Sequence, residues 1–173
     1  MELVQQIVPQ AREIDVLANP ADVFTPVYLQ EIESAGRALR INTPSTMIPD
    51  QAALRTAFER LRSEPARAQA VIVQPTLPRS AAASFALAQR LPSFSPVASF
   101  AGEGGLAGYA ANQVELFEQT AAYVDKILRG AEPALLPVTQ ASRFDLIINM
   151  RTATAIGVVV PPAVLALASS VLE

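Results

Sequence analysis

The stretch IDVLANP, residues 14–20, is separated by four residues from the dipeptide Thr25-Pro26. Its first five residues are mostly apolar and predict a buried strand, which Asn19-Pro20 ends. Thr25 suits the N-cap of a helix and Pro26 its first turn, and apolar residues then recur at helical spacing: Tyr28, Ile32, Ala35 and Leu39. A buried strand that leads directly into a helix is the repeating unit of an α/β fold.

The same unit recurs along the chain. Residues 70–73 (AVIV) predict the clearest short strand, with further strands expected at 40–46, 96–99 and 144–149. Helices are expected after two capping residues, Asp50 and Ser80. Strands that alternate with helices indicate a three-layer α/β/α domain with a mostly parallel sheet.

The strongest helix signal covers residues 113–128. Asn112 suits the N-cap, Glu115 sits at the capping-box position, and Gly130 lies where a helix C-terminal glycine belongs. The apolar face of this helix is wide: Val114, Leu116, Phe117, Ala121, Val124, Ile127 and Leu128. Such a face usually packs on a sheet and a neighbour, and the alternative is contact with another domain or chain.

The segment Thr152 to Leu172 carries no charge, but Gly157 and the pair Pro161-Pro162 interrupt it. These residues break a helix, so the segment predicts an extended piece, a proline stop and a closing helix over 163–172 rather than a membrane span.

Composition excludes several kinds of chemistry. The 173 residues carry a net charge of −3 and include no Cys and no His. A disulfide, a common zinc or haem site and a Cys or His catalytic centre are therefore not expected, and no metal or cofactor is predicted. The acidic balance and the few aromatic residues argue against nucleic acid as a partner. The N-terminus lacks the pattern of a signal peptide.

The residues expected at the carboxyl ends of the strands are mostly neutral hydrogen-bonding groups: Asn19, Gln74, Thr76 and Ser99. Ligands of parallel α/β sheets bind at this edge. Asp22 is the only carboxylate expected near it, and a turn role is the usual one for such a residue. With no nucleophile and no paired base apparent, the pattern favours binding and not catalysis.

The stretch EGGLAGYAANQ, residues 103–113, has two interpretations. Residues 102–107 match G-x-G-x-x-A, a dinucleotide-binding fingerprint, which requires a helix directly after the turn. The predicted helix begins only after Asn112. We therefore favour the second interpretation, in which the glycines occupy backbone positions that need a positive φ or a close approach of other atoms.

Beyond these patterns, the chain resembles a known family. It contains LPSFSPVASFAGEGGLAGYA (91–110), AAYVDKILRGAEPALLPVTQ (121–140), FDLIINMRTATAIG (144–157) and a late Pro-Pro. In order and spacing these segments are similar to the C-terminal half of ABC-transporter substrate-binding proteins of the tryptophan/tyrosine-binding-like type. REIDVLANPADVFTPVYLQEIESAGRAL (12–39) resembles an earlier segment of the same family.

The resemblance implies one lobe of a periplasmic-binding-protein type I fold plus a segment of the other lobe. Residues 1–100 would form the second-lobe core, 101–130 a hinge crossing and a helix of the other lobe, and 131–173 the return and closing helix. Gly104 and Gly105 would mark the hinge. Family members begin with a signal segment and a first lobe, which are expected to precede Met1.

The resemblance also implies a periplasmic component of an importer, with a small-molecule solute and an ABC permease as partners. Asn19, Gln74, Thr76 and Tyr109 would line the cleft. The family's Pro-Asp after the strand at 71–73 is replaced here by Gln74-Pro75-Thr76, so a carboxylate for a ligand ammonium is lost. The alternative is a self-associating interaction module that exchanges residues 104–130 in a homodimer.

Overall fold

The computed structural model describes residues 1–63 and 68–173, and these residues form a mixed α/β structure around one seven-stranded sheet. The spatial order is β2-β1-β3-β4-β5-β6-β7, and only the pair β5 and β6 is antiparallel. The strands are β1 (Ile14–Ala18), β2 (Ser45–Met47), β3 (Ala70–Val73), β4 (Ser93–Ser95), β5 (Ala107–Ala111), β6 (Phe144–Asn149) and β7 (Ser170–Leu172).

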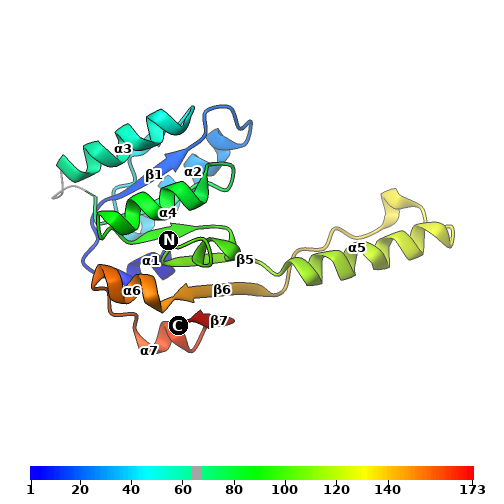
Figure 1. Cartoon of the computed structure of the whole chain (residues 1–173). Coiled ribbons are helices and arrows are strands. Elements are labelled where there is room, and N and C mark those ends of the chain that lie inside the picture. The colour runs from blue at the N-terminus through cyan, green and yellow to red at the C-terminus, as the bar shows by residue number, and fades with distance from the viewer. Residues whose placement is uncertain (64–67) are drawn as a thin grey trace.

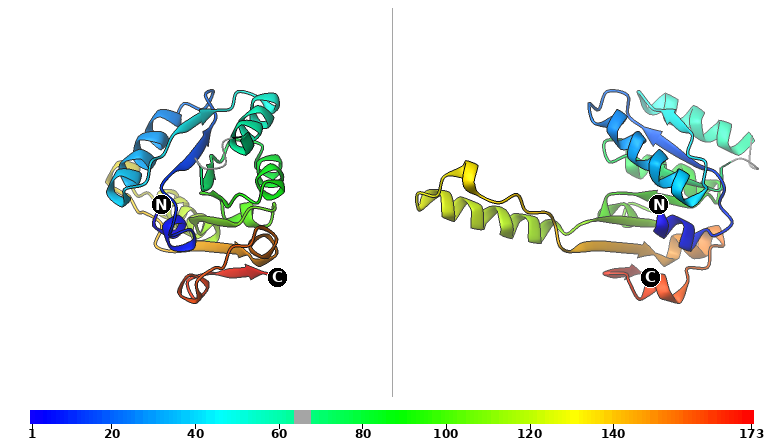
Figure 2. Two further views of the ribbon diagram at one scale, coloured as in Figure 1. Left: turned by 90° about the vertical axis from the view of Figure 1, so that its left-hand side faces the viewer. Right: turned by 180° about the vertical axis from the view of Figure 1, so that it is seen from behind.

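Helices cover both faces of this sheet (Figure 1 and Figure 2). They are α1 (Glu2–Ile7), α2 (Thr25–Leu39), α3 (Gln51–Ser63), α4 (Arg79–Ala88), α5 (Gln113–Leu128), α6 (Met150–Ile156) and α7 (Pro162–Leu165), with 3-10 turns η1 (Ala98–Ala101) and η2 (Pro133–Leu135). Helices α1 and α2 lie on one face of the sheet, and α3 and α4 lie on the other (Figure 2).

Strand β3 shows why two cores form. Ala70 and Ile72 belong to a buried cluster with residues of α1, whereas Val71 and Val73 belong to a second cluster with residues of α3 and α4. Successive side chains of a strand point to opposite faces, so an apolar run of four contributes to both layers. The predicted α/β/α architecture with a mostly parallel sheet is confirmed.

Helix α5 does not pack on the sheet. It extends away from the other elements, and residues 129–143 return beside it (Figure 1). We call residues 112–143 the arm and the remainder the body. Val114, Phe117 and Leu128 of the arm are 63%, 72% and 81% exposed. The prediction that the apolar face of this helix packs on the sheet is therefore wrong.

The predicted caps are partly correct. The Asn112 side chain caps α5 by accepting from Glu115 N at 2.9 Å, and Gly130, at φ 96°, follows the C-cap as expected. Thr25 is not an N-cap, because α2 begins after Phe24 and the Thr25 hydroxyl donates to Asn19 O at 2.6 Å. Ser80 is not one either, since α4 begins after Pro78.

Two predicted strands are displaced. Strand β4 occupies residues 93–95, and the predicted strand at 96–99 overlaps the 3-10 turn η1 instead. Strand β2 begins at Ser45, at the end of the predicted 40–46 segment. Both strands have three residues, and their position depends on pairing with β3 and β1 more than on their own sequence.

The C-terminal prediction is wrong in two respects. Residues 150–156 form helix α6 and not an extended piece, because Asn149 Oδ1 accepts from Thr152 N at 3.0 Å and Gly157, at φ 78°, ends the helix. The closing helix reaches only Leu165, and residues 170–172 instead pair in parallel with β6 as β7. Among the described residues, no helix has the length and apolar character that a membrane span needs.

Candidate functional site

Polar side chains meet at the carboxyl ends of β1 and β3. The Gln74 side-chain oxygen accepts from Asn19 N at 2.6 Å, and Asn19 Nδ2 donates to Thr76 Oγ1 at 3.4 Å. The two strands are parallel neighbours, with Leu17 opposite Val73, so the residues that follow them share one edge. The structure thus brings together three residues predicted to line a ligand site, Asn19, Gln74 and Thr76.

Two further residues complete this group. Asp22 Oδ2 accepts from Gln74 Nε2 at 3.0 Å and from Thr76 Oγ1 at 3.1 Å. Gln74 Nε2 also donates to Thr25 Oγ1 at 2.9 Å. We call Asn19, Asp22, Thr25, Gln74 and Thr76 the edge network. Asp22 has its turn role as well, because its Oδ1 accepts from Phe24 N at 2.9 Å.

Within the edge network the side chains differ in exposure. Gln74 is buried, at 2% exposed, and its amide group is occupied by protein partners. Thr76 is exposed and Asn19 is half-buried. Gln74 therefore holds the loops in place, while Asn19, Thr76 and Asp22 present hydroxyl, amide and carboxylate groups that can hydrogen-bond a small molecule.

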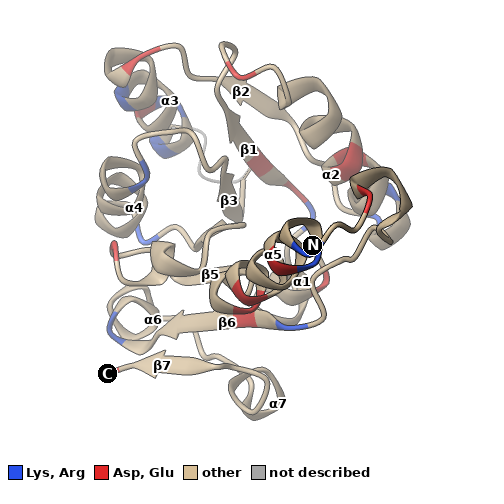
Figure 3. Ribbon diagram, turned by 90° about the vertical axis from the view of Figure 1, so that its right-hand side faces the viewer, with Lys and Arg blue, Asp and Glu red and all other residues tan. Residues whose placement is uncertain are grey.

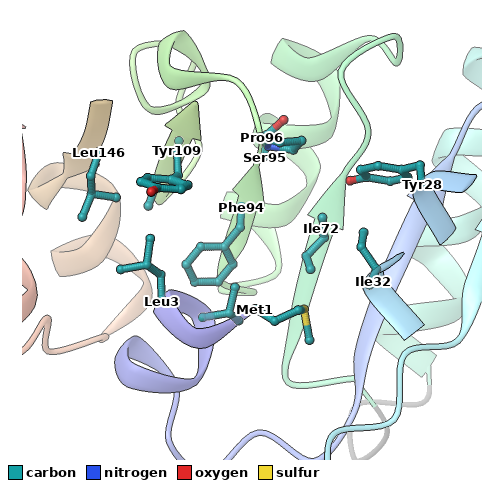
Figure 4. A pocket seen from close by; sticks show the side chains of 13 residues that line it. Met1, Leu3, Tyr28, Ile32, Ile72, Phe94, Ser95, Pro96, Tyr109 and Leu146 are labelled. Carbon is teal, nitrogen blue, oxygen red and sulfur yellow. The ribbon is translucent and has the colours of Figure 1, made fainter. Parts of the chain in front are cut away.

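Tyr109, the fourth predicted residue, is not part of the edge network. It lies on β5, and its ring stacks on Phe144 of β6 with centroids 5.4 Å apart. Its side chain instead lines a cavity of about 170 Å³ between α1, α2 and the sheet (Figure 4). The wall is mostly apolar and consists of Met1, Leu3, Val4, Tyr28, Ile32, Ile72, Phe94, Ser95, Pro96, Ala107, Gly108, Tyr109 and Leu146.

Tyr28 is a site residue that sequence reasoning missed. Its spacing with Ile32 assigns it only to the buried face of a helix. In the structure the Tyr28 hydroxyl oxygen is buried and has no hydrogen-bond partner in the described part of the chain. Burial raises the pKa of this phenol, so it stays protonated at physiological pH. Its OH points toward the wall formed by Ile72, Ser95 and Pro96 (Figure 4).

The glycine-rich turn is a structural feature of the body. Gly104 has φ 102°, and a Cβ on Gly105 would lie 2.1 Å from Phe100 Cε1. Strand β5 follows this turn, whereas the dinucleotide fingerprint needs a helix there. The prediction that these glycines occupy backbone positions with a positive φ or a close approach is confirmed, for Gly104 and Gly105 respectively. The chain leaves the body only after β5, at Asn112.

A salt bridge lies near the same edge. Arg79 Nη2 contacts Glu103 Oε1 at 2.9 Å, and Ser99 Oγ donates to the same oxygen at 3.1 Å. Burial alone would raise the pKa of Glu103, but the hydrogen bond and charge of Arg79 outweigh it and lower this pKa. Viewed from the arm, acidic and basic residues are interspersed over the molecule (Figure 3). No cluster of three possible metal ligands occurs within residues 1–63 and 68–173.

The fold is that of a periplasmic binding protein of type I: a mostly parallel sheet covered on both faces, with the polar group at its carboxyl edge. Residues 1–172 match a family described as ABC transporter substrate binding protein. The chain belongs to this family. A comparison with curated protein sequences gives no match.

Several solved structures have the same fold. A conserved domain protein from Vibrio cholerae has a TM-score of 0.85 at 25% identity, over 98% of this chain and 58% of its own. An ABC domain from Streptococcus pneumonia in complex with L-Trp has a TM-score of 0.78 at 21% identity, over 99% of this chain and 60% of its own. The substrate binding protein CD0873 from Clostridium difficile has a TM-score of 0.79 at 19% identity, over 99% of this chain and 58% of its own. This chain thus spans about three fifths of the length of these proteins.

Proposed function

We propose that the chain is the second lobe of the solute-binding component of an ABC importer, which holds a small organic molecule or an amino acid in a cleft between two lobes. The observation that carries this proposal is the edge network, in which Asn19, Thr76 and Asp22 present polar groups at the carboxyl edge of the sheet. This edge is where parallel α/β sheets bind their ligands. The family supports binding rather than catalysis.

The arm is the second support. Its exposed apolar residues need a partner surface, since large contiguous apolar patches are rare on free proteins. We propose that helix α5 packs in the other lobe, so that the body forms this lobe and residues 112–143 cross to the other lobe and return. The chain crosses near Asn112 and Arg143, where Asn112 N donates to Arg143 O at 2.9 Å. Gly104 and Gly105 lie before β5, at the other end of that strand from Asn112.

The proposed mechanism is closure of the cleft. A solute that contacts both lobes favours the closed state, because it binds that state more tightly, and the closed form docks on the permease. We propose a periplasmic location for the protein, as the family resemblance implies.

The ligand type follows from the polar groups present. The carboxylate of the family's Pro-Asp is lost at Gln74-Pro75-Thr76. Asp22 Oδ2, at 3.1 Å from Thr76 Oγ1, supplies a carboxylate from the neighbouring loop. We propose that Asp22 holds an ammonium or hydroxyl group of the solute, and that Asn19 and Thr76 complete the hydrogen bonds.

The test is an NMR titration of the chain with single amino acids and small polyols. One lobe supplies half of the contacts, so we expect millimolar binding that shifts the Asn19 and Thr76 resonances. Thr76→Val should weaken it about threefold to tenfold, and Thr120→Val on the arm is the matched control. Submicromolar binding by this chain would contradict the single-lobe proposal, and unshifted resonances at Asn19 and Thr76 would contradict the site.

A second candidate function is self-association through the arm. The observation that favours it is the same apolar face, with Phe117 at 72% and Leu128 at 81% exposed. Two copies that exchange residues 104–130 would cover both faces. Light scattering should then give about twice 18.4 kDa, and the double variant Phe117→Ser and Leu128→Ser should give a monomer. A monomer for the unaltered chain at high concentration excludes this candidate.

A further inference from the structure

Three helices begin at the carboxyl edge of the sheet, and a carboxylate of the protein lies at the N-terminus of each. These helices are α2, α3 and α4, which follow β1, β2 and β3. At α2, Asp22 Oδ1 accepts from Phe24 N at 2.9 Å, and at α3, Asp50 Oδ1 accepts from an amide of the first turn at 2.7 Å. At α4, Glu103 Oε2 accepts from the Ser80 hydroxyl at 3.4 Å. Because helix N-termini favour anions, the protein's own carboxylates occupy the positions that the carboxylate of a solute would take.

The N-terminus of α2, which adjoins the edge network, has few amide groups left for an anion. Phe24 N is bonded to the Asp22 side chain, and Thr25 N donates to Asp22 O at 3.0 Å. Pro26, the next residue, has no N–H. A carboxylate of a solute therefore has little to bond to at this end of the helix.

The basic residues of α2, α3 and α4 are either paired or remote from the edge network. Arg79, at the start of α4, pairs with Glu103 at 2.9 Å and donates to Pro75 O at 2.6 Å. Arg55 of α3 lies over the ring of Phe85, 5.8 Å from its centroid. The remaining basic residues of α2 and α3 are in the last turns of these helices, which return the chain to the opposite edge of the sheet. None of these side chains offers a free positive charge to a solute at the carboxyl edge.

Asp22 keeps a negative charge that no cation of the protein offsets. Its Oδ2 accepts from Gln74 Nε2 and Thr76 Oγ1, which are neutral donors. No Lys or Arg within residues 1–63 and 68–173 forms an ion pair with it. Asp22 is half-buried, and its carboxylate has three hydrogen bonds where about four can be accepted. One acceptor position and the charge remain for a cationic group.

We propose that the group bound by this lobe is a cationic nitrogen, and that the solute is an organic amine without a carboxylate beside that nitrogen. The inference rests on the proposed function and narrows its solute from small organic molecules and amino acids to amines. The ammonium group donates to Asp22, while Asn19 and Thr76 bond to further polar atoms of the same molecule. A carboxylate beside the ammonium would meet the charge of Asp22 with no cation to offset it, which selects against amino acids.

The experiment compares three probes that share one isobutyl group: 3-methylbutylamine, leucine and 4-methylpentanoate. The first carries only an ammonium group, the second an ammonium and a carboxylate, and the last only a carboxylate. Each is titrated into the chain while the Asn19 and Thr76 resonances are followed by NMR. We expect the amine to bind about threefold to tenfold more tightly than leucine, and leucine more tightly than 4-methylpentanoate.

Asp22→Asn removes the charge and keeps an oxygen that can accept from Phe24 N, so the turn before α2 should persist. In this variant the preference for the amine over leucine should disappear. Asp125→Asn is the matched control, because it makes the same change of net charge on the arm, where Asp125 pairs with Arg129. Its preference for the amine should equal that of the unaltered chain.

Glu103→Gln is an independent variant, which removes the charge that neutralises Arg79. Leucine should then gain about twofold to threefold in affinity relative to the amine, because a cation becomes available to its carboxylate. If Asp22→Asn does not fold, as circular dichroism would show, this variant decides, and an unchanged ratio of the two affinities would overturn the proposal.

Leucine that binds the unaltered chain as tightly as the amine would also overturn the proposal, as would a preference for the amine that survives in Asp22→Asn. In both cases the shifts at Asn19 and Thr76 would still support the proposed function. If no probe shifts these two resonances, the site itself is wrong and the amine proposal with it.

Discussion

The ring of Tyr109 stacks on the ring of Phe144, with centroids 5.4 Å apart and ring planes inclined by 15°. Tyr109 pairs with Leu146 and Ala111 with Phe144, so the two aromatic residues are diagonal neighbours across the antiparallel pair β5 and β6. This pair is the base of the arm. The stack therefore stabilises the position at which the chain leaves and re-enters the body.

Removing the stack should destabilise the chain. We expect Tyr109→Ala to lower the free energy of unfolding by about 1–2 kcal/mol, because it removes an aromatic pair and its apolar contacts. Tyr109→Phe keeps the ring and should remain within about 0.5 kcal/mol of the unaltered chain. Urea unfolding followed by circular dichroism measures both, and equal stability of the two variants would show that the stack contributes nothing.

Gln74 should be the residue of the edge network on which the stability of the body depends most. Gln74→Leu leaves Asn19 N–H without its acceptor and removes the contacts to Asp22 and Thr25. We expect a loss of about 2 kcal/mol in the free energy of unfolding. Thr76→Val, on an exposed neighbour, should cost less than about 0.5 kcal/mol. If the two variants unfold at the same urea concentration, Gln74 does not organise the loops.

The arm should loosen at low pH through Glu115. Its carboxylate accepts from the Ser142 hydroxyl and from Arg143 N at 2.8 Å, and these hydrogen bonds hold its pKa below the ordinary value of 4.5. Its folded-state pKa is thus lower than its unfolded-state pKa. The stabilisation is present above the unfolded value and is lost as pH falls through the folded value. We expect proteolysis at residues 141–143 to become faster as the pH falls below the ordinary carboxylate value of 4.5.

Glu115→Gln is the control for this pH effect. Glu103 also has a lowered pKa and contributes a pH dependence of the same sign. The difference between the unaltered chain and Glu115→Gln isolates the contribution of Glu115. A pH profile that is identical in the two proteins would assign the effect to Glu103 instead.

Gly105 should not accept a side chain. A Cβ there would lie 2.1 Å from Phe100 Cε1, and Phe100 is fully buried, so its ring has little room to move. We expect Gly105→Ala to lower the free energy of unfolding by about 2–3 kcal/mol, seen as a fall in Tm of several degrees. A Cβ on Gly102 would lie 3.3 Å from Ser99 O, so Gly102→Ala should lower the free energy of unfolding by less than about 1 kcal/mol.

Much of the fold was predictable because local rules govern it. The apolar runs at 14–18 and 70–73 form β1 and β3 with the predicted limits, and the Asn112 cap and the 113–128 stripe give α5. The edge network also follows from the sequence in part. Asn19 and Gln74 each come directly after a strand and Thr76 follows two residues later, and parallel strands bring such residues to one edge.

Other features were not predictable because they depend on residues far apart in the chain. The composition of Ser170–Leu172 suits the end of a helix as well as a strand. These residues form a strand because they pair with the free edge of β6. Glu115 occupies the capping-box position, yet its carboxylate bonds to residues 142 and 143 on the segment that returns to the body. Spacing along a helix contains no information about such a partner.

The sequence by itself determined the alternation of strands and helices over residues 14–91, the polar character of the carboxyl edge and the family of the chain, since apolar periodicity and turn residues act over a few positions. Only the tertiary structure decided that the apolar face of α5 is exposed, that Tyr109 lies apart from Gln74, and that the Tyr28 hydroxyl is buried with no hydrogen-bond partner among residues 1–63 and 68–173. Burial and contact depend on what the folded chain places opposite a side chain, and a linear pattern does not specify this.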